Sequence, residues 1–172
     1  MALQWTGPSL KTRSRELRLG RELALRAMYS ADLGDFEPQI AWLRCQTSFF
    51  SEEWRAAQHT DDDEHPWADL SPTTMETSQE IGRAMLFAFW DNRSQIDGII
   101  RGSSKRWKLN RMLPIERNIL RLGTFELLTH VIPSRDVIYD CVELAKIFGD
   151  AQTPRFVNGI LDQICQDNHI AL

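Results

Sequence analysis

The sequence predicts an all-α fold, a compact antiparallel bundle of about six to seven helices. Apolar residues recur at helical spacing almost throughout the chain, and no segment alternates apolar and polar residues as a half-buried strand would. Prolines and N-cap residues also divide the chain into helix-length segments. Its 172 residues, 42% of them hydrophobic, are enough for one domain with its own core. We expect a flexible basic tail over residues 1–12 and one domain over residues 13–168.

The first helix is expected to begin near Ser14 and to run to about Asp32. At about 100° per residue, most of its apolar side chains share one arc. These are Leu17, Leu19, Leu23, Ala24, Ala27, Met28 and Ala31. A basic stripe, with Arg21 at its edge, falls on the opposite side and consists of Lys11, Arg15, Arg18 and Arg26, together with Tyr29. Lys11 belongs to this stripe only if the helix begins at or before residue 11.

Two further helices in the middle of the chain are separated by an acidic loop. Pro38 suits the first turn of the earlier helix. Residues 58–73 contain the run Asp61–Glu64 and two prolines, and they predict an exposed loop. Ser71-Pro72 then opens a long helix that ends at the Gly-Ser-Ser of residues 102–104.

Residue pairs that contain proline mark the helix starts in the C-terminal third. Leu113-Pro114, Pro133-Ser134 and Thr153-Pro154 each begin a helix, because proline is tolerated in the first helical turn and not in the interior. The connections between these helices are short, which favours antiparallel neighbours.

The charge of the chain is strongly segregated. The net charge of −4 argues against a nucleic-acid binder. However, residues 11–26 hold six basic residues against two acidic ones, and residues 101–121 hold seven against one. Local fields steer a polyanion more than the total charge does, so RNA binding stays open.

The sequence gives no positive case for an enzyme. It contains no HExxH, GxSxG, P-loop or GxGxxG motif, and no ExxH pattern for a helix-borne metal site. His59 and His65 flank the acidic run, but a solvated loop is the favoured interpretation over a metal site. The three cysteines form no CxxC pair and suit the core. No membrane span or signal peptide is present in the sequence, so we expect a cytoplasmic protein.

Several segments resemble the NusB family in order and spacing. They are PIERNILRLGTFELL at residues 114–128, VELAK with a following Phe-Gly at residues 142–149, and FVNGILD at residues 156–162. Residues 21–29, RELALRAMY, also resemble the family's N-terminal helix. The likeness covers about residues 13–34 and 105–165, and it implies the family's helical fold.

The resemblance also implies a function without catalysis and without a cofactor. NusB proteins pair with NusE, a small-subunit ribosomal protein, and the pair binds single-stranded boxA RNA in the leader transcripts of ribosomal RNA operons. With RNA polymerase and other Nus factors, this antitermination complex suppresses premature termination. Some relatives are monomers and others are dimers, so a homodimer stays open.

The resemblance and the basic stripe together predict RNA-binding residues in two places. They are Lys11, Arg13, Arg15, Arg18 and Arg21 at the first helix, and Gln152, Arg155 and Phe156 at the start of the last helix. Basic side chains and free N–H groups at a helix start suit phosphates, and an exposed phenylalanine would stack on an unpaired base. The alternatives are a solvated helix face for the stripe and core packing for Phe156. Leu17 and Leu19 depart from the family, which often has arginine there.

Tyr29 and Glu116 match family positions near the NusE contact, and a carboxylate suits a basic partner. For Glu116 the alternative is a first-turn acid that any helix favours. Five basic residues surround Trp107 and could extend the RNA path, but a solvated loop with Trp107 in the core is the favoured interpretation. Gly159 is interpreted as a site of close helix packing. A helical module that binds only proteins is the other class of function.

Overall fold

The computed structural model describes residues 2–12, 14–49 and 70–172. In this part of the chain there are α-helices, one short 3-10 helix and no strand. The elements are α1 (Arg15–Gly34), α2 (Pro38–Phe49), α4 (Pro72–Ser103), η1 (Leu109–Arg111), α5 (Pro114–Thr129), α6 (Ser134–Phe148) and α7 (Thr153–Asp167). The predicted all-α bundle is confirmed. Arg13, the acidic run Asp61–Glu64 and the histidines beside it lie outside the described residues.

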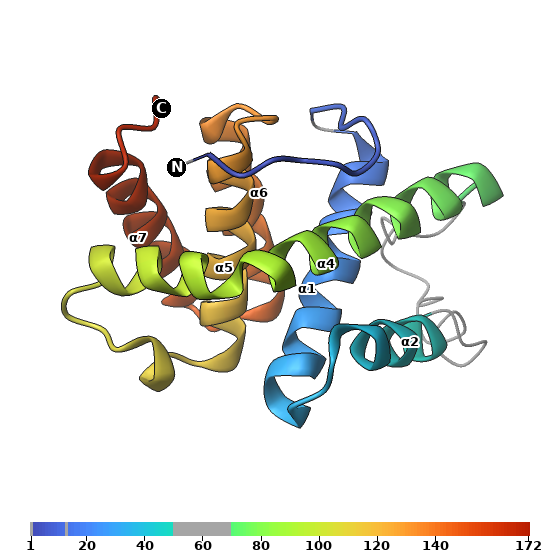
Figure 1. Cartoon of the computed structure of the whole chain (residues 1–172), viewed down its shortest axis with the longest axis horizontal. Helices are drawn as coiled ribbons and strands as arrows, with labels where there is room; N and C mark the ends of the chain where they lie inside the picture. The colour runs from blue at the N-terminus through green and yellow to red at the C-terminus, as the bar shows by residue number, and fades with distance from the viewer. Residues whose placement is uncertain (1, 13, 50–69) are drawn as a thin grey trace.

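The helices form two groups that the long α4 connects. In Figure 1, α5, α6 and α7 lie side by side, while α1 and α2 form the other part of the molecule. Helix α4 crosses over α1 and continues past α5 to α7. The turn after α4 therefore lies beside α7.

Side chains and prolines at the helix starts explain where the helices begin. The Ser14 hydroxyl accepts a hydrogen bond from the Leu17 N–H at 3.1 Å, and the Ser71 hydroxyl accepts one from the Thr74 N–H at 3.1 Å. These bonds satisfy N–H groups that have no partner inside the first helical turn. Proline stands in the first turn of α4, α5 and α7. The sequence predicted each of these starts to within one or two residues.

The apolar arc of α1 forms the centre of the core, as predicted, and all seven of its residues are buried. Two glycines allow α1 and α4 to cross closely. A Cβ atom on Gly20 would lie 2.6 Å from Cγ2 of Ile81, and one on Gly82 would lie 2.7 Å from the Gly20 carbonyl oxygen. Any larger residue at either position would push the two helices apart.

The N-terminal segment lies along the domain instead of extending away from it. The Leu3 N–H donates to the Leu128 carbonyl oxygen at 2.9 Å, and the Trp5 ring packs against Phe125 with centroids 6.2 Å apart. Leu10 is also partly buried against the core. This differs from the flexible tail expected for residues 1–12, because the apolar side chains between the polar ones anchor the segment.

Cys45, Cys141 and Cys165 are buried as free thiols, which agrees with their predicted place in the core. Burial raises the pKa of the Cys45 and Cys165 thiols to about 11. No cluster of three metal-ligating side chains occurs in the described ranges. None of the helices described there is both long and apolar enough to cross a membrane.

Candidate nucleic-acid interface

The basic stripe of α1 is only partly as predicted. Arg15 and Arg18 are exposed on the first turn of the helix. The helix begins at Arg15, so Lys11 lies in the preceding turn, where it is also exposed and its carbonyl oxygen accepts from the Ser14 N–H at 3.1 Å. These three residues present cations to solvent from one end of α1.

Arg21 is buried, and its predicted position at the edge of the exposed stripe is wrong. Its side chain is 1% exposed. Its Nε donates to Oε1 of Glu126 at 2.8 Å and its Nη2 donates to Oε2 of the same residue at 2.7 Å, which makes a bidentate pair with α5. Its Nη1 donates to Asp140 on α6. This Arg21 cluster, Arg21 with Glu126 and Asp140, joins three helices and leaves no side-chain surface for a phosphate.

The electrostatics of the Arg21 cluster fix the charge of the guanidinium. Burial opposes that charge, but Glu126 and Asp140 outweigh burial and raise the pKa of Arg21 above its ordinary value. Burial raises the pKa of the Asp140 carboxyl, although Arg21 and Arg18 act in the opposite direction. Arg18 is therefore close enough to influence Asp140 while its own side chain stays exposed.

At the start of α7, the candidate side chains are accessible to a ligand, but two backbone N–H groups already have a hydrogen-bond acceptor. Gln152 and Arg155 are exposed, and Phe156 is half-buried against the core. The Asp150 carboxylate accepts from the N–H groups of Gln152 and Thr153 at 2.8 and 3.0 Å, and these bonds lower its pKa. The expectation of free N–H groups for a phosphate is therefore wrong for these two, and Arg155 supplies the cation.

One contact joins α1 to the end of α6, just before the candidate residues of α7. The Arg26 guanidinium lies over the Phe148 ring, 4.9 Å from its centroid, and it also pairs with Glu22 at 2.8 Å. Phe148 ends α6 and precedes the turn that carries Gln152. The C-terminal half of α1 therefore lies beside the α6–α7 turn.

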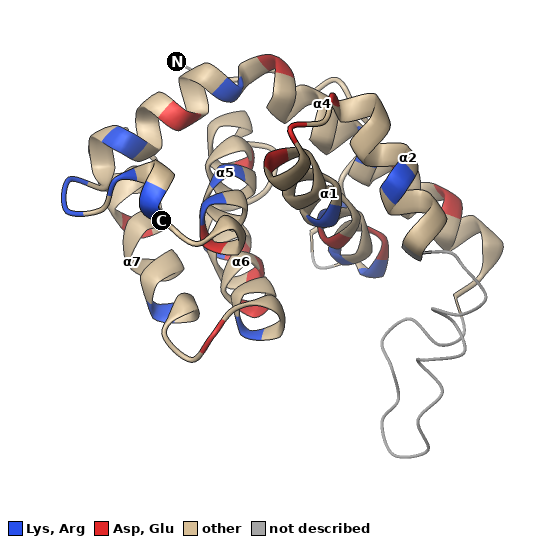
Figure 2. Ribbon diagram, turned by 90° about the horizontal axis from the view of Figure 1, so that it is seen from below, with Lys and Arg blue, Asp and Glu red and all other residues tan. Residues whose placement is uncertain are grey.

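The connection between α4 and α5 is more exposed than expected. Trp107 is 58% exposed, so its predicted position in the core is wrong. Its ring meets the Phe156 ring edge to face, with centroids 5.8 Å apart. Figure 2 shows Lys and Arg residues gathered on this connection. They are Arg101, Lys105, Arg106, Lys108 and Arg111, all of them exposed. An aromatic contact thus joins a basic loop to the start of α7.

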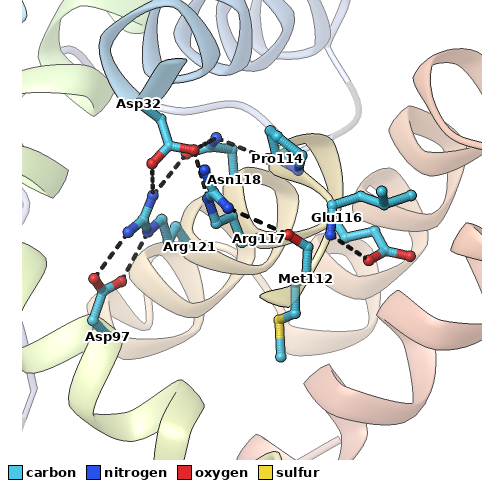
Figure 3. A network of polar contacts seen from close by, with 9 residues as sticks. Asp32, Asp97, Met112, Pro114, Glu116, Arg117, Asn118 and Arg121 are labelled. Atoms are coloured by element: carbon cyan, nitrogen blue, oxygen red, sulfur yellow. Dashed lines mark hydrogen bonds and ion pairs between the residues drawn. The ribbon is translucent and has the colours of Figure 1, made fainter. Parts of the chain in front are cut away.

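A polar network that the sequence analysis missed holds the C-terminal end of α1 against α4 and α5 (Figure 3). The Asp32 carboxylate accepts from Arg117 Nε at 2.6 Å and from Arg121 Nη1 at 2.9 Å. Arg121 also forms a bidentate pair with Asp97 at 2.8 and 2.9 Å. Burial would raise the pKa of Asp32, but hydrogen bonds from Arg117 and Arg121 outweigh it and lower the pKa. The spacing of the two arginines, one turn apart on α5, was the available signal.

The network places the two predicted partner-binding residues on adjoining elements. Tyr29 is 38% exposed on the last turns of α1. Glu116, which Figure 3 shows beside the network, is half-exposed at the start of α5. Glu116 Oε2 accepts from the Leu113 N–H at 3.0 Å, so this acid also caps its own helix. Exposed Leu33 and Leu113 lie on the same two helix ends. We call Tyr29, Leu33, Leu113 and Glu116 the partner surface.

Comparison with known proteins identifies the family. The model of the NusB family matches residues 19–166. The transcription antitermination protein NusB of Syntrophotalea carbinolica is 36% identical over 150 residues, which are 86% of this chain and 90% of that protein. The chain belongs to the NusB family.

Further NusB proteins and solved structures agree with this assignment. NusB of Bacillus mycoides is 32% identical over 149 residues, which are 86% of this chain and 95% of that protein. NusB of T. maritima has the same fold, with a TM-score of 0.67 at 25% identity over 91% of this chain and 94% of that one. The fold also matches a structure of antitermination factors NusB and NusE in complex with dsRNA, with a TM-score of 0.66 at 23% identity over 89% of this chain and 98% of that one.

The curated relatives are named for transcription antitermination and not for a reaction. The surface described above contains exposed cations and aromatic rings, the kinds of group that contact phosphates and stack on unpaired bases in nucleic-acid binders.

Proposed function

We propose that this NusB-family protein binds single-stranded boxA RNA of ribosomal RNA operon leader transcripts together with NusE, within an antitermination complex of RNA polymerase. The family match over residues 19–166 carries this proposal. The exposed cations at one end of α1 and at the start of α7 support it, because RNA requires exposed positive charge.

The proposed RNA surface consists of Lys11, Arg15, Arg18, Gln152, Arg155 and Phe156. Arg21 is not part of this surface, but the Arg21 cluster holds α1 against α5 and α6. The contact of Arg26 with Phe148 supports this surface, because it joins α1 to the end of α6, four residues before Gln152. Phosphate contacts from these arginines would give an affinity that falls steeply with salt. Arg13, which lies outside the described residues, remains a candidate from the sequence.

The partner surface is proposed to bind NusE. Exposed tyrosine and leucine side chains supply the apolar area that anchors a protein interface. Glu116 and the apolar groups around it would suit a basic ribosomal protein, because a carboxylate at the edge of such a patch attracts its cations. The α4–α5 connection borders the start of α5, where Glu116 lies, and its Trp107 contacts Phe156 of the RNA surface, so NusE and RNA would bind close to one another.

The proposal is tested by fluorescence anisotropy with labelled boxA RNA and a scrambled RNA, each with and without NusE. We expect selective boxA binding that NusE strengthens, and loss of the NusE-dependent gain in Tyr29→Ala. The double variant Arg18→Ala with Arg155→Ala should raise Kd and weaken the salt dependence. Arg44→Ala, an exposed arginine on α2, is the matched control and should leave both unchanged.

Two results would reject the proposal. Equal affinity for boxA and scrambled RNA, even with NusE, would show that the protein does not recognise the boxA sequence. Co-purification with NusE but no retention of RNA by the pair would instead indicate a module that binds only proteins.

A further inference from the structure

The exposed Trp107 stands between two hollows on the surface. One hollow of about 720 Å³ lies towards the Asp32 network, and one of about 340 Å³ lies towards α7. Ser104, Lys105 and Trp107 line both of them. The second hollow is near the lower end of the roughly 300–1,000 Å³ range of small-ligand sites. We call it the loop groove, and its lining includes Ser103, Lys105, Arg106, Trp107, Gly159 and Gln163.

Gly159 forms part of the loop groove, and its role differs from the expected one. A Cβ atom at this position would meet nothing within 4 Å, so the predicted close helix packing is wrong. Glycine is nevertheless the least favourable residue in a helix interior after proline, and Gly159 lies in the middle of α7. A glycine that packs against nothing in its own domain leaves the helix backbone open to a group from outside.

The charge of the loop groove favours an anion. Lys105 and Arg106 line it, and Asp167 is the carboxylate among its lining residues. Hydrogen bonds from Ser103 and Gln163 lower the pKa of Asp167, and the charge of Lys105 acts in the same direction, so the two cations of the groove outnumber its one carboxylate. Lys108 is exposed beside Trp107, which adds a further cation at the rim.

The aromatic contact connects the loop groove to the proposed RNA surface. Phe156 touches Trp107 edge to face, and Phe156 follows Arg155 at the start of α7. A strand of RNA that contacts Arg155 and Phe156 therefore reaches the indole without leaving the surface. Stacking on an exposed aromatic ring suits any unpaired base, since every base has a π-face.

We propose that the loop groove binds one unpaired nucleotide of the RNA. The base packs against the Trp107 indole and over the α7 backbone at Gly159, and the phosphate lies beside Lys105 and Arg106. This inference rests on the proposed RNA binding, and it adds a subsite on the α4–α5 connection to the surface of α1 and α7.

The first test is Gly159→Ala, with Gly98→Ala as the matched control. Gly98 is an exposed glycine inside α4, a Cβ there would also meet nothing within 4 Å, and it does not line the loop groove. Both variants should keep or raise the urea midpoint of unfolding, because alanine favours the helix. Only Gly159→Ala should weaken RNA binding, by about fivefold or more. A lower urea midpoint for Gly159→Ala, or an unchanged RNA affinity, would overturn the proposal.

The second test compares Trp107→Leu with Trp107→Phe in the full-length protein. The leucine variant keeps an apolar side chain but has no ring, and it should lose about 5- to 150-fold in affinity, the equivalent of one stacked base. The phenylalanine variant should recover most of that loss. Equal affinities for both variants and the wild type would show that no base stacks there.

The third test places the base in the RNA. In a series of boxA RNAs, each with one abasic nucleotide, one position should weaken binding to the wild type but not to Trp107→Leu. If every abasic position weakened binding to Trp107→Leu by the same factor as binding to the wild type, the result would contradict the subsite. If Arg18→Ala and Arg155→Ala weaken binding while the loop-groove variants do not, the subsite alone is wrong. If the wild type binds no RNA, the proposed function and the subsite are both wrong.

Discussion

Two basic regions of this protein use their charges in opposite ways. On α1, Arg21 is buried in a bidentate pair with Glu126, and Arg26 pairs with Glu22. At the α4–α5 connection, Lys105, Arg106 and Lys108 are exposed around Trp107, and Arg101 is exposed on the last turn of α4. The first region therefore uses part of its charge to hold the fold together, and the second presents its charge to solvent. A count of basic residues does not distinguish these two uses, so variants are needed that separate stability from binding.

The largest expected effect is on stability, at Arg21. Arg21→Ala leaves Glu126 and Asp140 buried without a cation, which should lower the free energy of unfolding by about 3–5 kcal/mol. Arg18→Ala, an exposed residue one turn earlier, should change it by less than about 0.5 kcal/mol. Urea unfolding measures both.

A charge-free version of the Arg21 cluster is the control for this prediction. Arg21→Met with Glu126→Met and Asp140→Leu replaces all three charges by apolar side chains of similar size and should recover most of the stability that Arg21→Ala loses. If Arg21→Ala were as stable as the wild type, the cluster would not hold the helices together.

The next effect concerns the Asp32 network at neutral pH. Asp32→Asn weakens hydrogen bonds to Arg117 and Arg121, and it should cost about 1–3 kcal/mol of unfolding free energy. Arg44→Ala, outside this network, is the comparison. An equal loss in both variants would mean that the network adds no stability of its own.

The same carboxylate predicts the sign of a pH effect. The pKa of Asp32 is lower in the folded protein than its ordinary value of about 3.9, so its stabilisation is complete above that value. It is lost as the pH falls through the lower, folded-state pKa. The stability difference between the wild type and Asp32→Asn should therefore shrink below about pH 4. A difference that stays constant from pH 7 to pH 3 would contradict this.

The smallest effect is on the salt dependence of RNA binding. Removal of one phosphate contact from a single strand lowers the slope of log affinity against log salt by about 0.7. Arg18→Ala and Arg155→Ala should each show this reduction, while Arg44→Ala should not. Slopes that are equal in all three variants would remove α1 and α7 from the RNA surface.

The sequence predicted the helices and the buried arc of α1 because local chemistry specifies them. Ser14 and Ser71 cap the helices that they precede, and proline stands in the first turn of three helices, at positions 72, 114 and 154. The family resemblance at residues 114–128 and 156–162 likewise depended only on short segments. Both kinds of signal are read within a few residues of the chain.

The burial of Arg21 and the exposure of Trp107 could not be predicted, because both depend on residues that are distant in the sequence. Arg21 finds Glu126 and Asp140 at sequence separations of 105 and 119 residues. A position at the edge of a helical stripe is exposed or buried according to what packs there, and helical phase alone does not specify it. Trp107 is apolar, which predicts burial, but its ring packs edge to face on Phe156 and stays 58% exposed. Its exposure, like the open space at Gly159, is a property of the assembled domain.

The central claim is that the exposed cations bind RNA while the buried Arg21 supports the fold. The most direct test measures boxA RNA affinity across a salt series for the wild type, Arg18→Ala and the charge-free Arg21 cluster. We predict that Arg18→Ala lowers the slope by about 0.7 and that the charge-free cluster, once shown to be folded, keeps the wild-type slope. A folded charge-free variant with a lower slope, beside an Arg18→Ala variant with an unchanged one, would contradict the account.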